Sequence, residues 1–259
     1  MTMKYFFGII LVLSTRLLFG QAFEQDKTTN DFFTQIKDYD LSVVWTADSI
    51  ADEEEIFERA PILGFIGDDY QRLHIRFISI IQNPLNPYEY FTYGKTKVKE
   101  NICSFQGTIK VTKSRLYKET DMPDWLPNYK QGYVECELNL YEDRKEKSTG
   151  LFSGKLKTNF IIDDKGKLKY DAINSVADGF YNNQFVGTWT SYNTKSTKKT
   201  HWGDYRIPES GDLDIGIGEF SIDDKYVKNG WENYMLAWSY HETPEGKKAR
   251  QKEKEQWWK

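Results

Sequence analysis

The chain has 259 residues, a net charge of −4 and an aromatic share of 16%. The acidic balance argues against a nucleic-acid-binding protein, which usually carries a basic footprint, and the abundant aromatic residues argue against disorder in the middle of the chain. The length suits one large domain or two small ones. Because no segment has a linker-like composition, we predict a single domain over residues 23–259.

Residues 1–22 have the pattern of a cleaved secretory signal. A positive charge at Lys4 is followed by an apolar run at 6–13 and by small residues for cleavage at 20–22. The apolar run is too short to span a bilayer and is followed by Arg16, which argues against the alternative of an uncleaved anchor. We therefore predict an exported protein, periplasmic or secreted, with no transmembrane span after cleavage. Cleavage would remove Lys4 and Arg16 and change the net charge from −4 to −6.

The first part of the predicted domain gives mixed signals. Residues 23–38 are polar with a weak helical pattern, and residues 41–46 (LSVVWT) have the composition of a strand. The acidic stretch 48–59 predicts either a short exposed helix or a loop before the next strand.

Strand signals dominate from residue 62 onward. Leu73, Ile75 and Phe77 alternate with polar residues, and the apolar positions then shift to Ile78 and Ile80, which predicts a half-buried strand with a bulge. Alternation and turn composition predict these further elements: strands at 102–112, 134–140, 151–162 and 167–171, and a hairpin turn at 163–166.

A short motif, Phe-x-Gly-x-apolar, occurs at residues 105–109, 152–156 and 185–189. In a strand it places the Phe, the Gly and the second apolar residue on one face, where the glycine relieves crowding and lets the strand bend. The unequal spacing of the copies argues against a solenoid or propeller. We interpret them as similarly bent strands of a curved sheet or barrel.

Two cysteines, Cys103 and Cys136, fall in predicted strands. Export would permit a disulfide between them, but sequence does not supply the geometry, and two buried free thiols are the alternative. Two cysteines are too few for a disulfide scaffold or a cysteine-based zinc site.

The C-terminal part begins with residues 232–241 (ENYMLAWSYH), which have the composition of a final strand. The tail at 243–259 has a helical composition, with Thr243 as a possible N-cap and Pro244 in the first turn. We expect the two tryptophans near its end to pack back on the domain, with a disordered basic tail as the alternative.

Together these segments predict a mainly β fold, a single antiparallel barrel or sandwich of about eight to ten strands with short flanking helices. Gly187-Thr188-Trp189 resembles the Gly-x-Trp strand of lipocalin- and avidin-like barrels, which makes a calycin-like barrel one form of this fold. Residues 64–77 and 202–216 are similar to uncharacterised exported β-rich proteins of Bacteroidetes-type bacteria. This resemblance implies export and no particular activity.

The candidate site lies between residues 201 and 220. The sequence has no nucleophile elbow, phosphate-binding loop or HExxH motif, and we expect no cofactor and no bound metal. The candidate ligand-binding residues are Trp202, Asp204, Tyr205 and Arg206. Aromatic rings beside a carboxylate and an arginine can stack on a sugar or anchor a peptide. In the alternative structural interpretation, the same residues only pack, pair and turn.

A catalytic interpretation is also open, because paired carboxylates can hydrolyse a glycosidic bond. The candidates for this role are Asp212, Asp214 and Glu219. Our leading expectation is an exported, non-enzymatic protein that binds a small ligand, a glycan or another protein. An exported carbohydrate-active hydrolase and a structural envelope protein are the alternatives, and we expect no nucleic-acid partner.

Overall fold

The computed structural model describes residues 28–51, 56–120, 124, 126 and 128–259. The predicted signal and its cleavage site lie outside the described residues. None of the helices found in the described part of the chain is long and apolar enough to cross a lipid bilayer.

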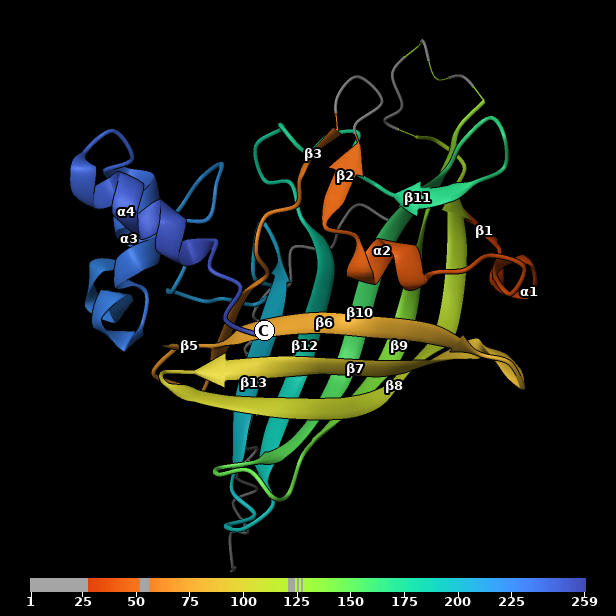
Figure 1. Cartoon of the computed structure of the whole chain (residues 1–259). Coiled ribbons are helices and arrows are strands. Elements are labelled where there is room, and N and C mark those ends of the chain that lie inside the picture. Colours follow the sequence, from red (N-terminus) through yellow and green to blue (C-terminus); the bar gives the residue numbers. More distant parts are fainter. Residues whose placement is uncertain (1–27, 52–55, 121–123, 125, 127) are drawn as a thin grey trace, which may run out of the picture.

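One antiparallel sheet of eleven strands forms most of the fold (Figure 1). Its strands are β1 (Thr29–Asp31), β4 (Leu63–Ile66), β5 (Gln71–Arg72), β6 (His74–Asn83), β7 (Asn86–Val98), β8 (Asn101–Tyr117), β9 (Lys130–Glu142), β10 (Gly150–Ile162), β11 (Leu168–Tyr170), β12 (Asn182–Ser191) and β13 (Thr197–Asp204). The order across the sheet is β5-β4-β13-β12-β10-β9-β8-β7-β6, with β1 beside β8 and β11 beside β10. The predicted mainly β, antiparallel class is confirmed.

Short elements complete the structure. They are the small sheet of β2 (Ser49–Ala51) and β3 (Ile56–Glu58), the helices α1 (Phe33–Ile36), α2 (Ser42–Thr46), α3 (Glu232–Ser239) and α4 (Pro244–Glu253), and the 3-10 helix η1 (Asp224–Asn229). Figure 1 shows α2 above β6, and α3 and α4 together at one side of the sheet. The sheet has more strands than the eight to ten expected, because β1 and β5 are only two or three residues long and leave no periodic signal. The short strand β11 was predicted, at residues 167–171.

The sheet curls into a half-barrel, in which β6 and β7 cross in front of β9, β10, β12 and β13 (Figure 1). Large apolar side chains fill the inside of the curl, including Tyr90, Phe105, Ile109, Val134, Leu138, Phe152, Phe160, Phe185 and Trp202. The two ends of the sheet are adjacent in the chain, since only the fully buried Leu73 separates β5 from β6. The predicted bulge in β6 is confirmed by a register shift between Phe77 and Ser79.

The Phe-x-Gly-x-apolar motif marks places where a ring lies against the backbone of the curved sheet. Gly154 of β10 and Gly187 of β12 are directly opposite each other. A Cβ atom on either glycine would lie within 2.8 Å of the Cζ of Phe185, whose ring therefore covers both positions. Phe105 of the first copy covers Gly94 of β7, a glycine outside the motif, at 2.4 Å from its Cζ, whereas the motif glycine Gly107 lies against the backbone of β9. The interpretation of the motif as part of a curved sheet is confirmed.

Three local predictions were wrong. The segment 41–46 forms α2 with Leu41 as its N-cap and not a strand, because Leu41, Val44 and Trp45 are buried together at helical spacing. The acidic stretch 48–59 contains the strands β2 and β3 in its described part, instead of a helix or a loop. Most of the segment 232–241 forms α3 (Glu232–Ser239) and not a strand; the buried Trp231 precedes the helix, and Ala237 is its buried residue.

The C-terminal tail is helical, as predicted. The Thr243 side chain accepts a hydrogen bond from the Gly246 amide at 3.0 Å and caps α4. After the helix, Trp257 packs against the ring of His74 on β6, with 6.0 Å between centroids. Trp258 lies under the guanidinium of Arg76, 4.7 Å from ring centroid to Cζ. The two tryptophans therefore pack against β6, as predicted.

The cysteines are two buried free thiols, which was the alternative to a disulfide. Cys136 of β9 is opposite Val111 of β8, eight residues along the strand from Cys103. At about 3.3 Å per residue, that separation far exceeds the Cα distance of about 7 Å that a disulfide can bridge. Burial raises the pKa of Cys103 to about 12, so this thiol stays protonated at neutral pH.

Candidate functional site

Asp204, one of the predicted ligand-binding residues, is a fully buried structural charge. Its two carboxylate oxygens accept hydrogen bonds from Arg59 at 2.9 and 2.7 Å. One of them also accepts bonds from the Tyr170 hydroxyl at 3.0 Å and the Asn183 amide at 2.7 Å. Burial, and then the charge of Asp204, raise the pKa of Tyr170 well above its ordinary value. The site residue predicted at 204 therefore has no free oxygen for a ligand.

The partners of Asp204 also hold α2 on the half-barrel. Arg59 donates to the carbonyl of Trp45 at 3.1 Å, and Asn183 donates to the carbonyl of Val44 at 3.1 Å. The Trp45 indole donates to Thr158 at 2.9 Å, and Thr158 donates to Asn183 at 2.8 Å. Asp204 is therefore the centre of a polar network that connects α2 to the sheet.

Trp202, the second predicted ligand-binding residue, also belongs to the core. Its ring is 1% exposed and stacks on Phe185 with centroids 3.7 Å apart. For Trp202 and Asp204 the structure matches the packing and pairing of the structural interpretation, because neither side chain reaches solvent.

Tyr205 and Arg206 lie where the chain leaves β13. Tyr205 adopts a left-handed backbone conformation, with φ of 64°, and its ring meets Phe180 edge to face at 4.9 Å. Arg206 donates to the Asp214 carboxylate at 3.0 and 2.5 Å and to the carbonyls of residues 216–218. These bonds use all the donor groups of a guanidinium. Arg206 therefore fixes the 214–218 loop and keeps no donor for a ligand.

The three carboxylates of the catalytic interpretation are not gathered at one pocket. Asp214 is paired with Arg206, and Asp212 is bound by Lys225 at 2.8 Å and by the Tyr226 hydroxyl at 3.0 Å. The hydrogen bond from Lys225 is the main cause that lowers the pKa of Asp212. Only Glu219 lines one of the two pockets described below. In the described residues, no group of three His, Cys, Asp or Glu is placed to hold a metal ion.

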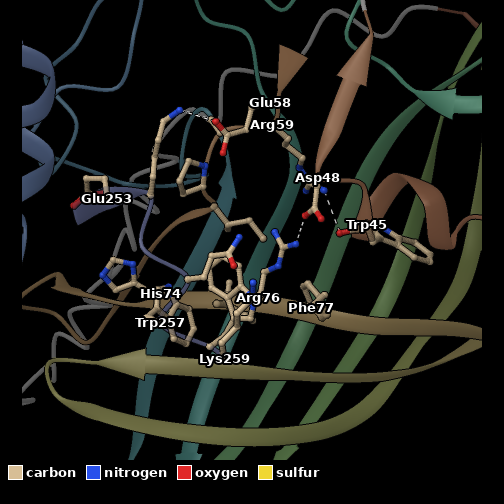
Figure 2. Close-up of a pocket in the computed structure, with 17 residues that line it drawn as sticks. Trp45, Asp48, Glu58, Arg59, His74, Arg76, Phe77, Glu253, Trp257 and Lys259 are labelled. Carbon is tan, nitrogen blue, oxygen red and sulfur yellow. Dashed lines mark hydrogen bonds and ion pairs between the residues drawn. The ribbon is translucent and has the colours of Figure 1, made fainter. Parts of the chain in front are cut away.

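Two pockets lie on either side of residues 60–61. The first, called the polar pocket, has a volume of about 330 Å³ and is shown in Figure 2. It lies between α2, the start of β6 and the tail that follows α4. Its lining includes Asp48, Glu58, Arg59, His74, Arg76 and Trp258.

The charges of the polar pocket pair with one another and hold the tail. Figure 2 shows Arg76 pointing from β6 toward Asp48, with which it forms an ion pair. Glu58 pairs with Lys254 of the tail at 2.6 Å. Buried Arg72 forms two hydrogen bonds with Glu253, at 2.9 and 2.6 Å. This lining explains how the tail is fixed and leaves few free groups for a ligand.

His74 of the polar pocket should make stability depend on pH. Burial first, and then Arg72 and Lys97, lower its pKa well below the ordinary 6.5. The unfolded chain therefore takes up a proton on His74 at a higher pH than the folded chain does. The stability that neutral His74 provides is complete above pH 6.5 and is lost as the pH falls toward the folded pKa.

We expect wild type to lose more stability than His74→Gln when the pH falls from 7.5 to 5, measured by urea unfolding at a series of pH values. His241→Gln is the control, because this histidine is half exposed near the end of the chain. Parallel pH profiles for wild type and His74→Gln would contradict the prediction.

The second pocket, called the aromatic pocket, has a volume of about 250 Å³ and lies between α3 and the loops around residues 178, 205 and 219. Its aromatic lining is Phe180, Tyr205, Phe220, Tyr234 and Trp238. Phe220 and Tyr234 have ring centroids 5.5 Å apart, and Tyr234 and Trp238 are 6.1 Å apart. Burial is the main cause that raises the pKa of Tyr234, whose hydroxyl donates to the Phe220 carbonyl at 3.2 Å.

Sequence reasoning found Tyr205, Arg206 and Glu219 of this lining and missed the residues from α3 and from the loop before β12. One signal was available. Trp231, Tyr234 and Trp238 are spaced by three and four residues, which places aromatic rings on one face of a helix. No sequence pattern marks the loop residues Asp178 and Phe180, because only the tertiary fold places them near Tyr205 in the pocket lining.

Comparisons of this chain with protein-family models, with curated proteins and with solved structures found no match.

Proposed function

We propose that this protein is an exported, non-enzymatic binding protein that holds a small organic ligand in the aromatic pocket. The observation that carries the proposal is the convergence of five aromatic side chains from four separate segments on one hollow of about 250 Å³. Small-ligand sites are typically concave and lined by aromatic side chains with a few polar groups. The export part of the proposal rests on the composition of residues 1–22.

The walls of the aromatic pocket are held by interactions that need no ligand. Arg206 fixes the loop that carries Gly218 and Glu219. The ion pair between Arg72 and the lining residue Glu253 holds the end of α4. A pocket that is formed in advance loses little conformational entropy when a ligand enters, which favours binding.

Hydrolysis is less well supported than binding. A glycosidase needs one carboxylic acid and one carboxylate on either side of the scissile bond. Asp212 and Asp214 both have basic partners, and neither lines the pocket that Glu219 lines. If the protein were purely structural, the half-exposed ring of Trp238 in the lining of the aromatic pocket would have no role in binding.

We expect a thermal-shift screen of glycans and small organic molecules to find compounds that raise the melting temperature of the purified chain. A ligand at 100 times its Kd stabilises the folded state by about 2.7 kcal/mol. The shift should be lost or strongly reduced in Trp238→Ala. It should persist in Tyr141→Ala, a matched control because this ring on β9 is 52% exposed and lies outside the pocket. If no compound stabilises the wild type, or if both variants respond equally, the pocket is not the binding site.

A further inference from the structure

We infer that the ligand of the aromatic pocket is a small organic cation with an ammonium group. This inference rests on the proposed function, that the pocket binds a small molecule. It concerns the chemistry that the pocket selects, and it follows from the charges and rings of the lining.

Two carboxylates of the lining have no ion-pair partner. Asp178 and Glu219 are both exposed, and neither pairs with a basic side chain in the described part of the chain. Both are close to Gly218: a Cβ atom on that glycine would be 2.6 Å from Oδ1 of Asp178, and Glu219 is the next residue along the chain. The Gly179 amide donates to the Gly218 carbonyl at 2.8 Å and ties the two loops together. Both acidic residues of the lining therefore come from this pair of joined loops.

The other charged groups of the lining are neutralised. Arg206 is bound by Asp214 and by backbone carbonyls, and Glu253 is bound by Arg72. The lining therefore has an uncompensated charge of about two negative units, carried by two exposed carboxylates beside apolar walls. This charge disfavours carboxylate and phosphate ligands and favours a cation.

The rings make an ammonium group more suitable than a metal ion. Cations are attracted to the faces of aromatic rings, and organic ammonium ligands are commonly recognised in this way. Arginines already lie on two rings of the lining, Arg72 over Tyr234 at 5.4 Å and Arg250 over Trp238 at 5.3 Å. The edge-to-face pair of Phe180 and Tyr205 has no such cation among the described residues. A metal ion would instead need a shell of several oxygen ligands.

The test compares choline with its neutral isostere 3,3-dimethyl-1-butanol, which differs only in having carbon in place of the quaternary nitrogen. Isothermal titration calorimetry of the full chain is expected to give choline an affinity at least about tenfold higher. The difference should shrink as salt is added, because the carboxylates are exposed.

Variants that remove one negative charge each test whether the two carboxylates cause the preference for choline. Glu219→Gln and Asp178→Asn are expected to weaken choline binding by about three- to tenfold each and to leave binding of the neutral isostere unchanged. Both residues are exposed without ion-pair partners, so the variants should fold like wild type, which their melting temperatures check. Glu137→Gln, an exposed acid on β9 outside the pocket, is the matched control and should bind choline as wild type does.

The outcomes separate this inference from the proposed function. Equal binding of choline and its isostere, or binding of only neutral compounds in a wider screen, would overturn the ammonium inference and leave the pocket as a ligand site. Choline binding that Glu137→Gln weakens as much as Glu219→Gln would overturn it too, because the effect would then be one of net charge. If neither probe nor any screened compound binds, both the inference and the proposed function fail.

Discussion

Replacing Asp204 with alanine is expected to lower the free energy of unfolding by about 3–5 kcal/mol, the range for breaking a buried ion pair from one side. The substitution leaves Arg59, whose side chain is 7% exposed, charged and without a counterion. It also removes the acceptor of the Tyr170 hydroxyl and one acceptor of Asn183. We expect the attachment of α2 to the sheet to weaken as well, because Arg59 and Asn183 also donate hydrogen bonds to carbonyl groups of this helix.

Urea unfolding of Asp204→Ala, Arg59→Met and the double variant measures this effect. The double variant should be less destabilised than the sum of the two single variants, because it leaves no buried charge unpaired. Glu137→Ala removes an exposed carboxylate of β9 and should change stability by about 0.5 kcal/mol or less. A loss below about 1 kcal/mol for Asp204→Ala would contradict the role of this residue as the centre of the network.

Replacing Trp231 with alanine is expected to cost about 3–5 kcal/mol through the cavity that it leaves. The side chain is fully buried in a second apolar cluster, against which Tyr234 of α3 packs. The other buried members of this cluster are Leu63, Phe65, Tyr70, Ile207, Leu213, Phe220 and Ile222. Its indole donates to the Tyr70 carbonyl at 2.9 Å, and the guanidinium of Arg72 lies 4.7 Å from the ring. The substitution therefore weakens apolar contacts, a hydrogen bond and a cation–π contact together.

Hydrogen exchange should show that this effect is regional. Amides of α3 and α4 are expected to lose protection in Trp231→Ala, while those of β8, β9 and β10 keep it, because the main core lies inside the curl and does not include Trp231. Trp238→Ala, within α3, is the control, and loss of its half-exposed ring should cost much less stability. Uniform loss of protection across the sheet would contradict the separation into two clusters.

The sequence predicted the fold best where one face of a strand is buried. Val134, Cys136, Leu138 and Leu140 alternate with polar residues, and all four are buried in β9. It failed at α2, because valine and tryptophan favour strands while the burial of Leu41, Val44 and Trp45 follows helical spacing. Local composition does not decide between these two readings in a segment of five residues.

Only part of the candidate site could be predicted, because residue type is visible in the sequence and tertiary placement is not. Tyr205 and Arg206 stood out by residue type and lie at the aromatic pocket, whereas Asp204 stood out equally and is buried. Its partner Arg59 is 145 residues earlier in the chain, and no local pattern shows such a pairing. Asp178 and Trp238 reach the pocket only through the packing of a loop and a helix on the sheet.

The join between β5 and β6 has a consequence for how the half-barrel resists disassembly. Hydrogen-bonded edges of an open sheet can fray independently, and an exposed edge can pair with another chain. Here the first and last strands of the ladder are neighbours in the chain through Leu73, whose amide donates to the Gly64 carbonyl of β4. The two edge strands are therefore linked covalently through one residue, so that moving either edge strand away from the sheet would displace the other.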